Sequence, residues 1–372
     1  MMRNLNASNT LSTVHLELKT RVMSTILQCK LLLVILFAFM STCHPPTEPV
    51  QPGRRDYVWT VDTLTVPYGD TFYPSRIWGS AADDVWLVGT GMTMRLIWHF
   101  NGTEWQTDST FRSINPSSLW GFSSDDIWLG NLGNVFWHYN GYAWSKYSEV
   151  TPPEGYDITS IEGLWGSNPA SVWGVGFATN LTTTNSRGII MHFDGLQWNF
   201  KPIPSLPVAF IKIRKQRSSQ QLFVQGQRTA HVPRDTFKIY TYDGSESLHE
   251  IYSSTKVMTL AQINGEVYFI SQRKIYTYHH NEFILWKDFS TTNFIAGIFG
   301  RSEKDFFGYT TNSDYSIYGI GHYNGMDFQE IYTLPRWLRI SGMVIFERDI
   351  FFQCYSLKSN MNIVVHGKLP DK

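Results

Sequence analysis

Short runs in which apolar and polar residues alternate recur along the chain from Tyr57 onward. In the first group the runs cover roughly Ser75–Gly79, Val85–Gly89, Arg95–Phe100 and Glu104–Ser109. Apolar residues at every second position predict strands with one buried face. Short turns separate the runs, so we expect these four strands to form one antiparallel sheet.

The group of four strands is repeated along the chain. A Trp-Gly pair followed by a second Trp recurs about every 42–45 residues, in Ile77–Gly89, Leu119–Trp128 and Leu164–Gly176. Each copy continues with a His-aromatic-Asn/Asp-Gly-x-x-Trp signature, in His99–Trp105, His138–Trp144 and His192–Trp198. The Asn-Gly or Asp-Gly step predicts a two-residue hairpin turn, because these residues tolerate positive φ.

Fainter copies bring the number of repeats to seven. Their second strands begin at Gln221–Phe223, Glu266–Tyr268, Asp305–Phe307 and Asp349–Phe351. The last copy breaks off after His366–Lys368 without a fourth strand, and Tyr57–Asp62 resembles the missing strand. One such sheet cannot bury both of its faces alone, so successive sheets must stack, and radial stacking gives a β-propeller.

We therefore predict an all-β fold over residues 57–369: a single seven-bladed β-propeller of four-stranded antiparallel blades. The ring is expected to close by pairing the N-terminal strand Val58–Leu64 with the last three strands, at about Ser341–Phe346, Ile350–Ser356 and Asn362–His366. Such closure leaves no free edge between the first and last blades.

The repeat resembles that of bacterial β-propeller repeat lipoproteins, with the pattern W-G-S-x-x-x-D-V-W…H-F-D-G-x-x-W, and it is distantly similar to sialidase Asp-box repeats. It differs from WD40 units, which have a Gly-His…Trp-Asp pair, and from kelch units, which have Gly-Gly. The Asp-box loop is also shortened, because Asp194 and Gly195 are adjacent. The resemblance implies a fold and a bacterial surface location, but no single activity.

The N-terminus has the pattern of an export signal, which we assign to residues 1–43, with Met23 as an alternative start. Basic residues precede the ten apolar residues Leu31–Met40, a run shorter than the roughly 17–25 residues of a membrane-spanning helix. Met40–Cys43 resembles the lipobox of bacterial lipoproteins, which implies acylation of Cys43, although Thr42 departs from the usual Gly, Ala or Ser. Residues 44–56 are rich in Pro and predict a stiff tether. We expect a protein exported and anchored to the bacterial cell envelope, at the outer membrane or cell surface.

The amino-acid composition of the chain limits the kinds of partner and of cysteine chemistry that we expect. The 31 Lys and Arg residues balance 31 Asp and Glu residues, and only 17% of the chain is charged, so nothing favours nucleic acid as a partner. Of the 3 Cys residues, Cys29 would leave with the signal and Cys43 would carry lipid. Cys354 would then remain alone, and we interpret it as a small buried residue.

The chemically reactive residues are interpreted mainly as scaffold. Histidines at one repeat position would be spread around a ring rather than gathered on a metal ion: His99, His138, His192, His322 and His366. The pairs Asp83-Asp84 and Asp125-Asp126 are interpreted as turn formers, and the repeated tryptophans as packing between blades. We predict no catalytic residue, no metal and no cofactor, and the arginines show no register that would bring three together for sialidase chemistry.

The irregular loops carry the functional hypothesis. In such a blade, the loops between second and third strands open on the same face as the connections between blades, and function is often carried on such loops. Candidate ligand-binding residues on this face are Tyr68, Phe72, Tyr73, Tyr156, Arg228, His231 and Trp337. The sequence thus predicts a monomeric, non-catalytic binding module for a glycan or protein at the cell envelope, anchored in the membrane through Cys43. Two alternatives stay open: these aromatics simply pack the loops down, or the protein is a glycan-active hydrolase or lyase with its site in the central channel.

Overall fold

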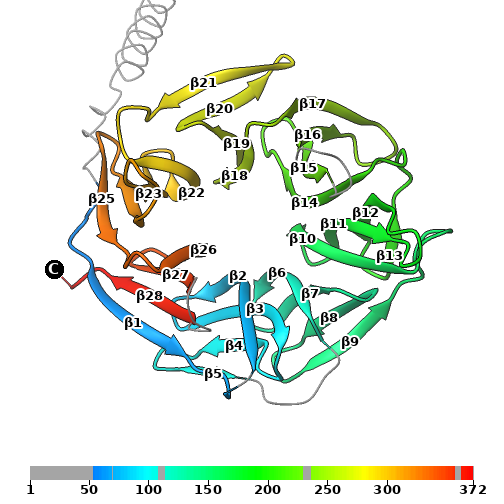
Figure 1. Cartoon of the computed structure of the whole chain (residues 1–372), viewed down its shortest axis with the longest axis horizontal. Coiled ribbons are helices and arrows are strands. Elements are labelled where there is room, and N and C mark those ends of the chain that lie inside the picture. The colour runs from blue at the N-terminus through cyan, green and yellow to red at the C-terminus, as the bar shows by residue number, and fades with distance from the viewer. Residues whose placement is uncertain (1–52, 69, 108–113, 229–235, 357–361, 372) are drawn as a thin grey trace, which may run out of the picture. The chain divides into compact units, whose positions relative to one another are not determined.

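The computed structural model describes residues 53–371 except 69, 108–113, 229–235 and 357–361. Over these residues the chain forms seven four-stranded antiparallel sheets, arranged as the blades of a β-propeller (Figure 1). The predicted all-β, seven-bladed fold is confirmed. The predicted signal, Cys43 and most of the tether lie outside the described residues, and no described helix is long and apolar enough to cross a bilayer.

Each blade uses its strands in chain order, from the centre of the ring to the rim. The strands of blades 1 to 3 are β2 (Thr71–Ala81), β3 (Asp84–Met92), β4 (Ile97–Phe100) and β5 (Trp105–Thr107); β6 (Pro116–Ser123), β7 (Asp126–Asn131), β8 (Val135–Tyr139) and β9 (Trp144–Glu149); β10 (Ile158–Asn168), β11 (Ser171–Thr179), β12 (Ser186–Phe193) and β13 (Trp198–Phe200).

Blades 4 to 7 follow the same order. Their strands are β14 (Val208–Lys215), β15 (Leu222–Arg228), β16 (Phe237–Tyr242) and β17 (Leu248–Ser254); β18 (Thr259–Ile263), β19 (Glu266–Ser271), β20 (Lys274–His279) and β21 (Glu282–Asp288); β22 (Phe294–Ser302), β23 (Asp305–Thr311), β24 (Tyr318–Tyr323) and β25 (Phe328–Thr333); β26 (Leu338–Ile345), β27 (Asp349–Ser356) and β28 (Asn362–Lys368), with β1 (Val58–Leu64) as the fourth strand of blade 7.

The two ends of the propeller domain meet in blade 7. Strand β1 pairs antiparallel with β28, in a register that runs from Val58 opposite Lys368 to Leu64 opposite Asn362. Leu64 is buried, and the Trp59 ring packs 4.8 Å from the Tyr332 ring of blade 6, centroid to centroid. The predicted closure of the ring is confirmed.

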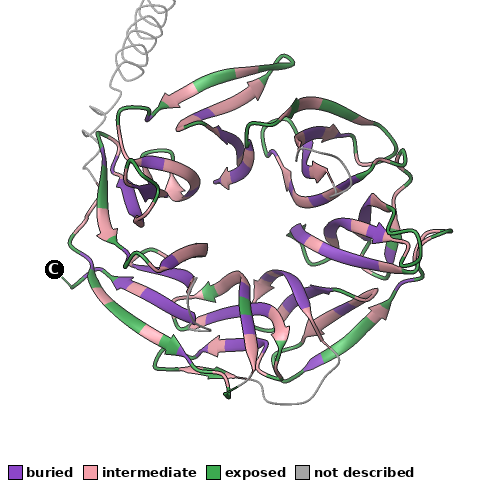
Figure 2. Ribbon diagram, viewed as in Figure 1, coloured by how far each residue is buried: buried purple, intermediate pink, exposed green. Residues whose placement is uncertain are grey.

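Apolar side chains fill the spaces between neighbouring blades, whereas exposed residues are frequent on outer strands such as β1 and β21 (Figure 2). One cluster joins Trp86 of blade 1 to Leu119 and Trp144 of blade 2. The Trp78 ring lies against Gly121 of blade 2, where a Cβ atom would stand 2.5 Å from the ring. The repeated Trp-Gly pair therefore lets an indole of one blade approach the backbone of the next.

The two faces of the ring carry different connections. We call the face with the first-to-second and third-to-fourth strand turns the turn face; a Cβ atom at Gly102 in one such turn would lie 2.8 Å from Asp83 in the other. The loop face is the opposite one, with the second-to-third strand loops and the connections between blades. The chain enters on the turn face, where the Gly53 N–H donates to the carbonyl of Asn324 at 3.3 Å.

Candidate functional site

The repeated histidines belong to the scaffold of the blades. Each imidazole bonds a residue at the start of the second strand of its own blade, over 2.7 to 2.9 Å: His99 with Asp84, His138 with Asp126, His192 with Ser171, His322 with Asp305 and His366 with Asp349. The His99 ring also stacks on Trp86 of the second strand, with centroids 4.1 Å apart. The histidines therefore hold second and third strands together.

The interpretation of Asp84 and Asp126 as turn formers needs correction. The Asp84 carboxylate bonds His99 and accepts the indole N–H of Trp86 at 3.0 Å. Burial raises the pKa of Asp84, but the hydrogen bonds from His99 and Ser80 outweigh it and hold this pKa below its usual value. The sequence signal was the joint recurrence of Asp and His in four of the seven copies.

Metal and thiol chemistry find no support in the described ranges. No group of three or more His, Cys, Asp or Glu side chains is placed there to hold a metal ion. The Cys354 thiol is buried, and burial raises its pKa well above the ordinary value. A buried thiol with a raised pKa is inert as a nucleophile.

The residues predicted to bind a ligand do not form one cleft. Tyr68 and Tyr73 of blade 1 are exposed. Tyr156 of blade 3 and Trp337 of blade 7 are half-buried against apolar clusters, so they pack their loops down. Arg228 is half-buried at the end of β15 in blade 4.

Two of the residues predicted to bind a ligand are not among the exposed residues that the structure describes. Phe72 is only 1% exposed and packs in the core beside Trp98, with ring centroids 6.4 Å apart. It therefore offers a ligand no surface, and its assignment as a contact residue needs correction. His231 lies outside the described residues.

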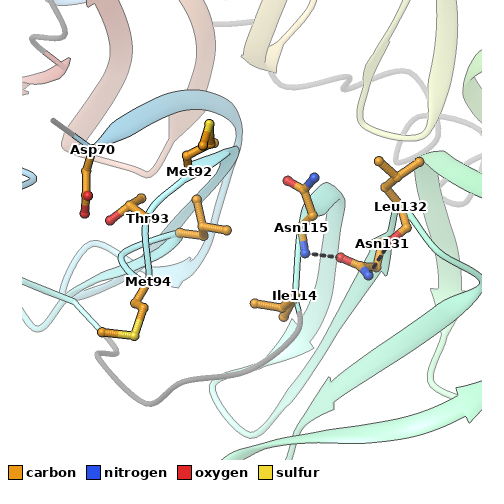
Figure 3. A pocket seen from close by; sticks show the side chains of 10 residues that line it. Asp70, Met92, Thr93, Met94, Ile114, Asn115, Asn131 and Leu132 are labelled. Atoms are coloured by element: carbon orange, nitrogen blue, oxygen red, sulfur yellow. Dashed lines mark hydrogen bonds between the residues drawn. The ribbon is translucent and has the colours of Figure 1, made fainter.

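An open groove of about 610 Å³ lies on the loop face between blades 1 and 2 (Figure 3). Its apolar part includes Met92, Met94 and Leu132, which are 81%, 57% and 41% exposed. Asp70 and Asn115 are among its polar lining residues. Exposed apolar side chains gathered at one concave place are a common feature of binding sites.

Hydrogen bonds fix the blade 2 wall of the groove. The side-chain oxygen of Asn131 accepts the backbone N–H of Asn115, and its amide nitrogen donates to the carbonyl of Leu132 at 2.6 Å. Leu132 in turn forms an isolated bridge with Ser160 of blade 3. The wall is thus fixed by hydrogen bonds within blade 2 and by a bridge to blade 3.

The blade 2 wall of the groove contains one polar atom that makes no hydrogen bond. Among the described residues, the buried Oδ1 atom of Asn115 has no hydrogen-bond partner. A buried acceptor without a partner costs about 1–3 kcal/mol. Sequence reasoning missed this site, whose one local signal is the pair of methionines in Gly91-Met92-Thr93-Met94, directly after a predicted strand.

The chemistry of the groove favours a peptide over a sugar. Thioether side chains are flexible and polarisable, so they adapt to varied apolar side chains. None of the ten described residues that line the groove is aromatic, whereas flat rings are the usual cover for apolar sugar faces.

Fold and site together define a class: a seven-bladed β-propeller with an apolar groove on its loop face. The chain matches no known family profile and no curated protein. Among solved structures it is similar to "YCF48 bound to D1 peptide", with 12% identity, a TM-score of 0.56 and coverage of 87% of this chain and 99% of that one. It is also similar to YCF48 from Cyanidioschyzon merolae, with 10% identity, a TM-score of 0.54 and coverage of 82% and 98%. At these identities the likeness establishes the fold alone.

Proposed function

We propose that the protein is a non-catalytic, monomeric propeller that binds a protein partner through the groove between blades 1 and 2. The observation that carries the proposal is the group of exposed apolar side chains, Met92, Met94 and Leu132, that line one groove on the loop face. A peptide offers apolar side chains that match such a surface. The described peptide complex of YCF48 is consistent with a propeller in this role.

The double variant Met92→Asp/Met94→Asp is expected to weaken peptide binding at least about tenfold, because two carboxylates would have to be desolvated on contact. Both side chains are exposed, so the melting temperature should stay unchanged. The probe is a peptide selected from a random displayed library on the full chain, and fluorescence anisotropy gives its Kd.

The matched control is Met326→Asp, because Met326 is equally exposed but lies in a third-to-fourth strand turn on the turn face. Equal loss in the control, or unchanged binding in the groove variant, would remove the groove from the proposal. A further variant replaces Tyr68, Tyr73, Tyr156 and Trp337 by Ala; if it alone abolished binding, the site would lie over those loops. A glycan array run in parallel tests a glycan as the ligand.

We also propose that Cys43 carries the lipid anchor in a bacterial envelope. In support, the described chain begins on the turn face, where Arg55 donates to the Asp327 carboxylate at 2.7 Å.

Cys43→Ala is expected to move the protein from the membrane fraction to the soluble fraction, because no acyl chain can be attached. Metabolic labelling with an alkyne fatty acid, followed by fractionation, measures both effects. Cys29→Ala is the control and should remain labelled. Continued labelling and membrane retention of Cys43→Ala would show that the anchor lies elsewhere.

A further inference from the structure

Three cations extend from two inner strands toward the centre of the ring: Arg76 of β2, and Lys212 and Arg214 of β14. Blades 1 to 3 carry a Trp where blade 4 carries Arg214, because Arg214 pairs with Phe223 as Trp165 pairs with Trp173. Lys212 follows a β-bulge in β14, as Arg76 does in β2. Blade 4 therefore departs from the repeat by carrying Arg214 at the Trp position of its inner strand, two residues after Lys212.

The contacts of these side chains lie on the inner side of the ring. Arg76 of blade 1 donates to the carbonyl of Glu162 in blade 3 at 2.6 Å, past blade 2. The Arg214 guanidinium of blade 4 lies 5.6 Å from the centroid of the Trp120 ring in blade 2, past blade 3. Blades that are not neighbours meet only around the axis, so these side chains converge there. The spacing of the arginines in the sequence did not predict this convergence. In the structure, two arginines and one lysine come together around the axis.

The positive charge at this place is poorly balanced. Burial, together with the nearby charges of Arg214 and Arg76, lowers the pKa of Lys212 to about 7. Burial together with Arg76 lowers the pKa of Arg214 to about 10. The charge of the Glu162 carboxylate opposes the lowering of the Arg76 pKa by burial. This carboxylate also accepts a hydrogen bond from the Ser160 hydroxyl at 2.5 Å. Three cations thus share one carboxylate in a partly desolvated place, an arrangement that is costly without a counter-ion.

The hydrogen bonds leave donors available. Lys212 donates to the carbonyl of Leu260 at 2.9 Å, and Arg214 donates to the carbonyl of Ile213 in its own strand at 2.6 Å. The rest of the Arg214 guanidinium has no hydrogen bond to a described residue and lies over an indole. All three cations keep solvent-accessible surface. A planar guanidinium held against an aromatic ring is a ready bidentate donor to an oxyanion.

We propose that the centre of the ring binds a small oxyanion, a carboxylate or a phosphate group, between Arg76, Lys212 and Arg214. Arg214 supplies paired N–H donors and Trp120 fixes its plane. Lys212 and Arg76 add charge from the opposite sides of the axis. This site is separate from the groove on the loop face and does not depend on peptide binding there.

The test uses titration calorimetry on the full chain in detergent, with inorganic phosphate and glucuronate as separate probes at constant ionic strength. Arg214→Met and Lys212→Met are each expected to weaken binding at least about tenfold, the effect of losing one charge-assisted contact. The control Lys256→Met removes an exposed cation between blades 4 and 5 and should bind as the unaltered chain does. Binding of phosphate alone assigns a phosphate ligand, and binding of glucuronate alone assigns a carboxylate.

A pH series with glucuronate separates binding from packing, because this probe stays ionised above pH 6. Affinity should fall severalfold between pH 6 and pH 8.5 as Lys212 loses its proton, while Arg76 and Arg214 keep their charges. Lys212→Arg keeps the charge and should abolish the pH dependence without loss of binding. If neither probe binds, or if Arg214→Met and Lys212→Met both bind like the unaltered chain, these cations serve only to bond backbone carbonyls and the proposal fails.

Discussion

A chain that begins at residue 65, without β1, is expected to melt roughly 5–20 °C below a chain that begins at Gly53. The truncation removes the fourth strand of blade 7 and leaves β28 as an open edge. It also removes buried Tyr57 and Leu64 and the half-buried Trp59. Burial of such side chains contributes about 1.5–3 kcal/mol each, and each kcal/mol shifts the melting temperature by about 1–2 °C in a domain of this size.

Circular dichroism melts of both truncated chains beside the full chain measure the effect. The chain from Gly53 keeps the bond of Arg55 to Asp327 and all of β1, so it should melt like the full chain. Equal melting of the two truncated chains would mean that β1 does not close the ring in solution.

The fold was predictable because its signals are local. Alternating apolar residues define strands, and steps such as Asn101-Gly102 define hairpins, within a few residues of sequence. Gly102 has the expected positive φ of 89°. The closure of the ring was predictable as well, because the last repeat has no fourth strand and Tyr57–Asp62 resembles that missing strand.

The faces of individual side chains were less predictable. The first strand of blade 1 was predicted to begin at about Ser75, but β2 begins at Thr71. Neighbouring residues in a strand point to opposite sides, so Phe72 is buried while Tyr73 is 60% exposed. No such alternation is expected in a loop, so Phe72 and Tyr73 were both assigned to the surface.

Both candidate sites depend on contacts between distant segments. In the groove, the backbone N–H of Asn115 donates to the side chain of Asn131, and Met92 joins them from another blade. Arg76 reaches a carbonyl 86 positions away. Alignment of blade 4 with the first three copies would have placed Arg214 at the Trp position, but that repeat is too weak to align from sequence alone.

Trp128→Ala is expected to lower the free energy of unfolding by about 3–5 kcal/mol, the usual cost of truncating a large buried aromatic side chain. Trp128 is 3% exposed and joins two blades, because its ring packs 4.8 Å from Phe193 and 5.7 Å from Trp198 of blade 3, centroid to centroid. Its removal would leave a cavity between blades 2 and 3. Urea denaturation measures the difference.

Trp128→Phe separates packing from hydrogen bonding. The indole Nε1 atom of Trp128 has no hydrogen-bond partner among the described residues, so Phe loses volume but no bond and should cost less than half as much as Ala. Tyr142→Ala in the same blade is the control, because this exposed side chain should change stability by no more than about 0.5 kcal/mol. Equal costs for Ala and Phe would assign the contribution of Trp128 to the indole N–H, and a cost for Ala as small as that of the control would refute the role of the repeated tryptophans in joining the blades.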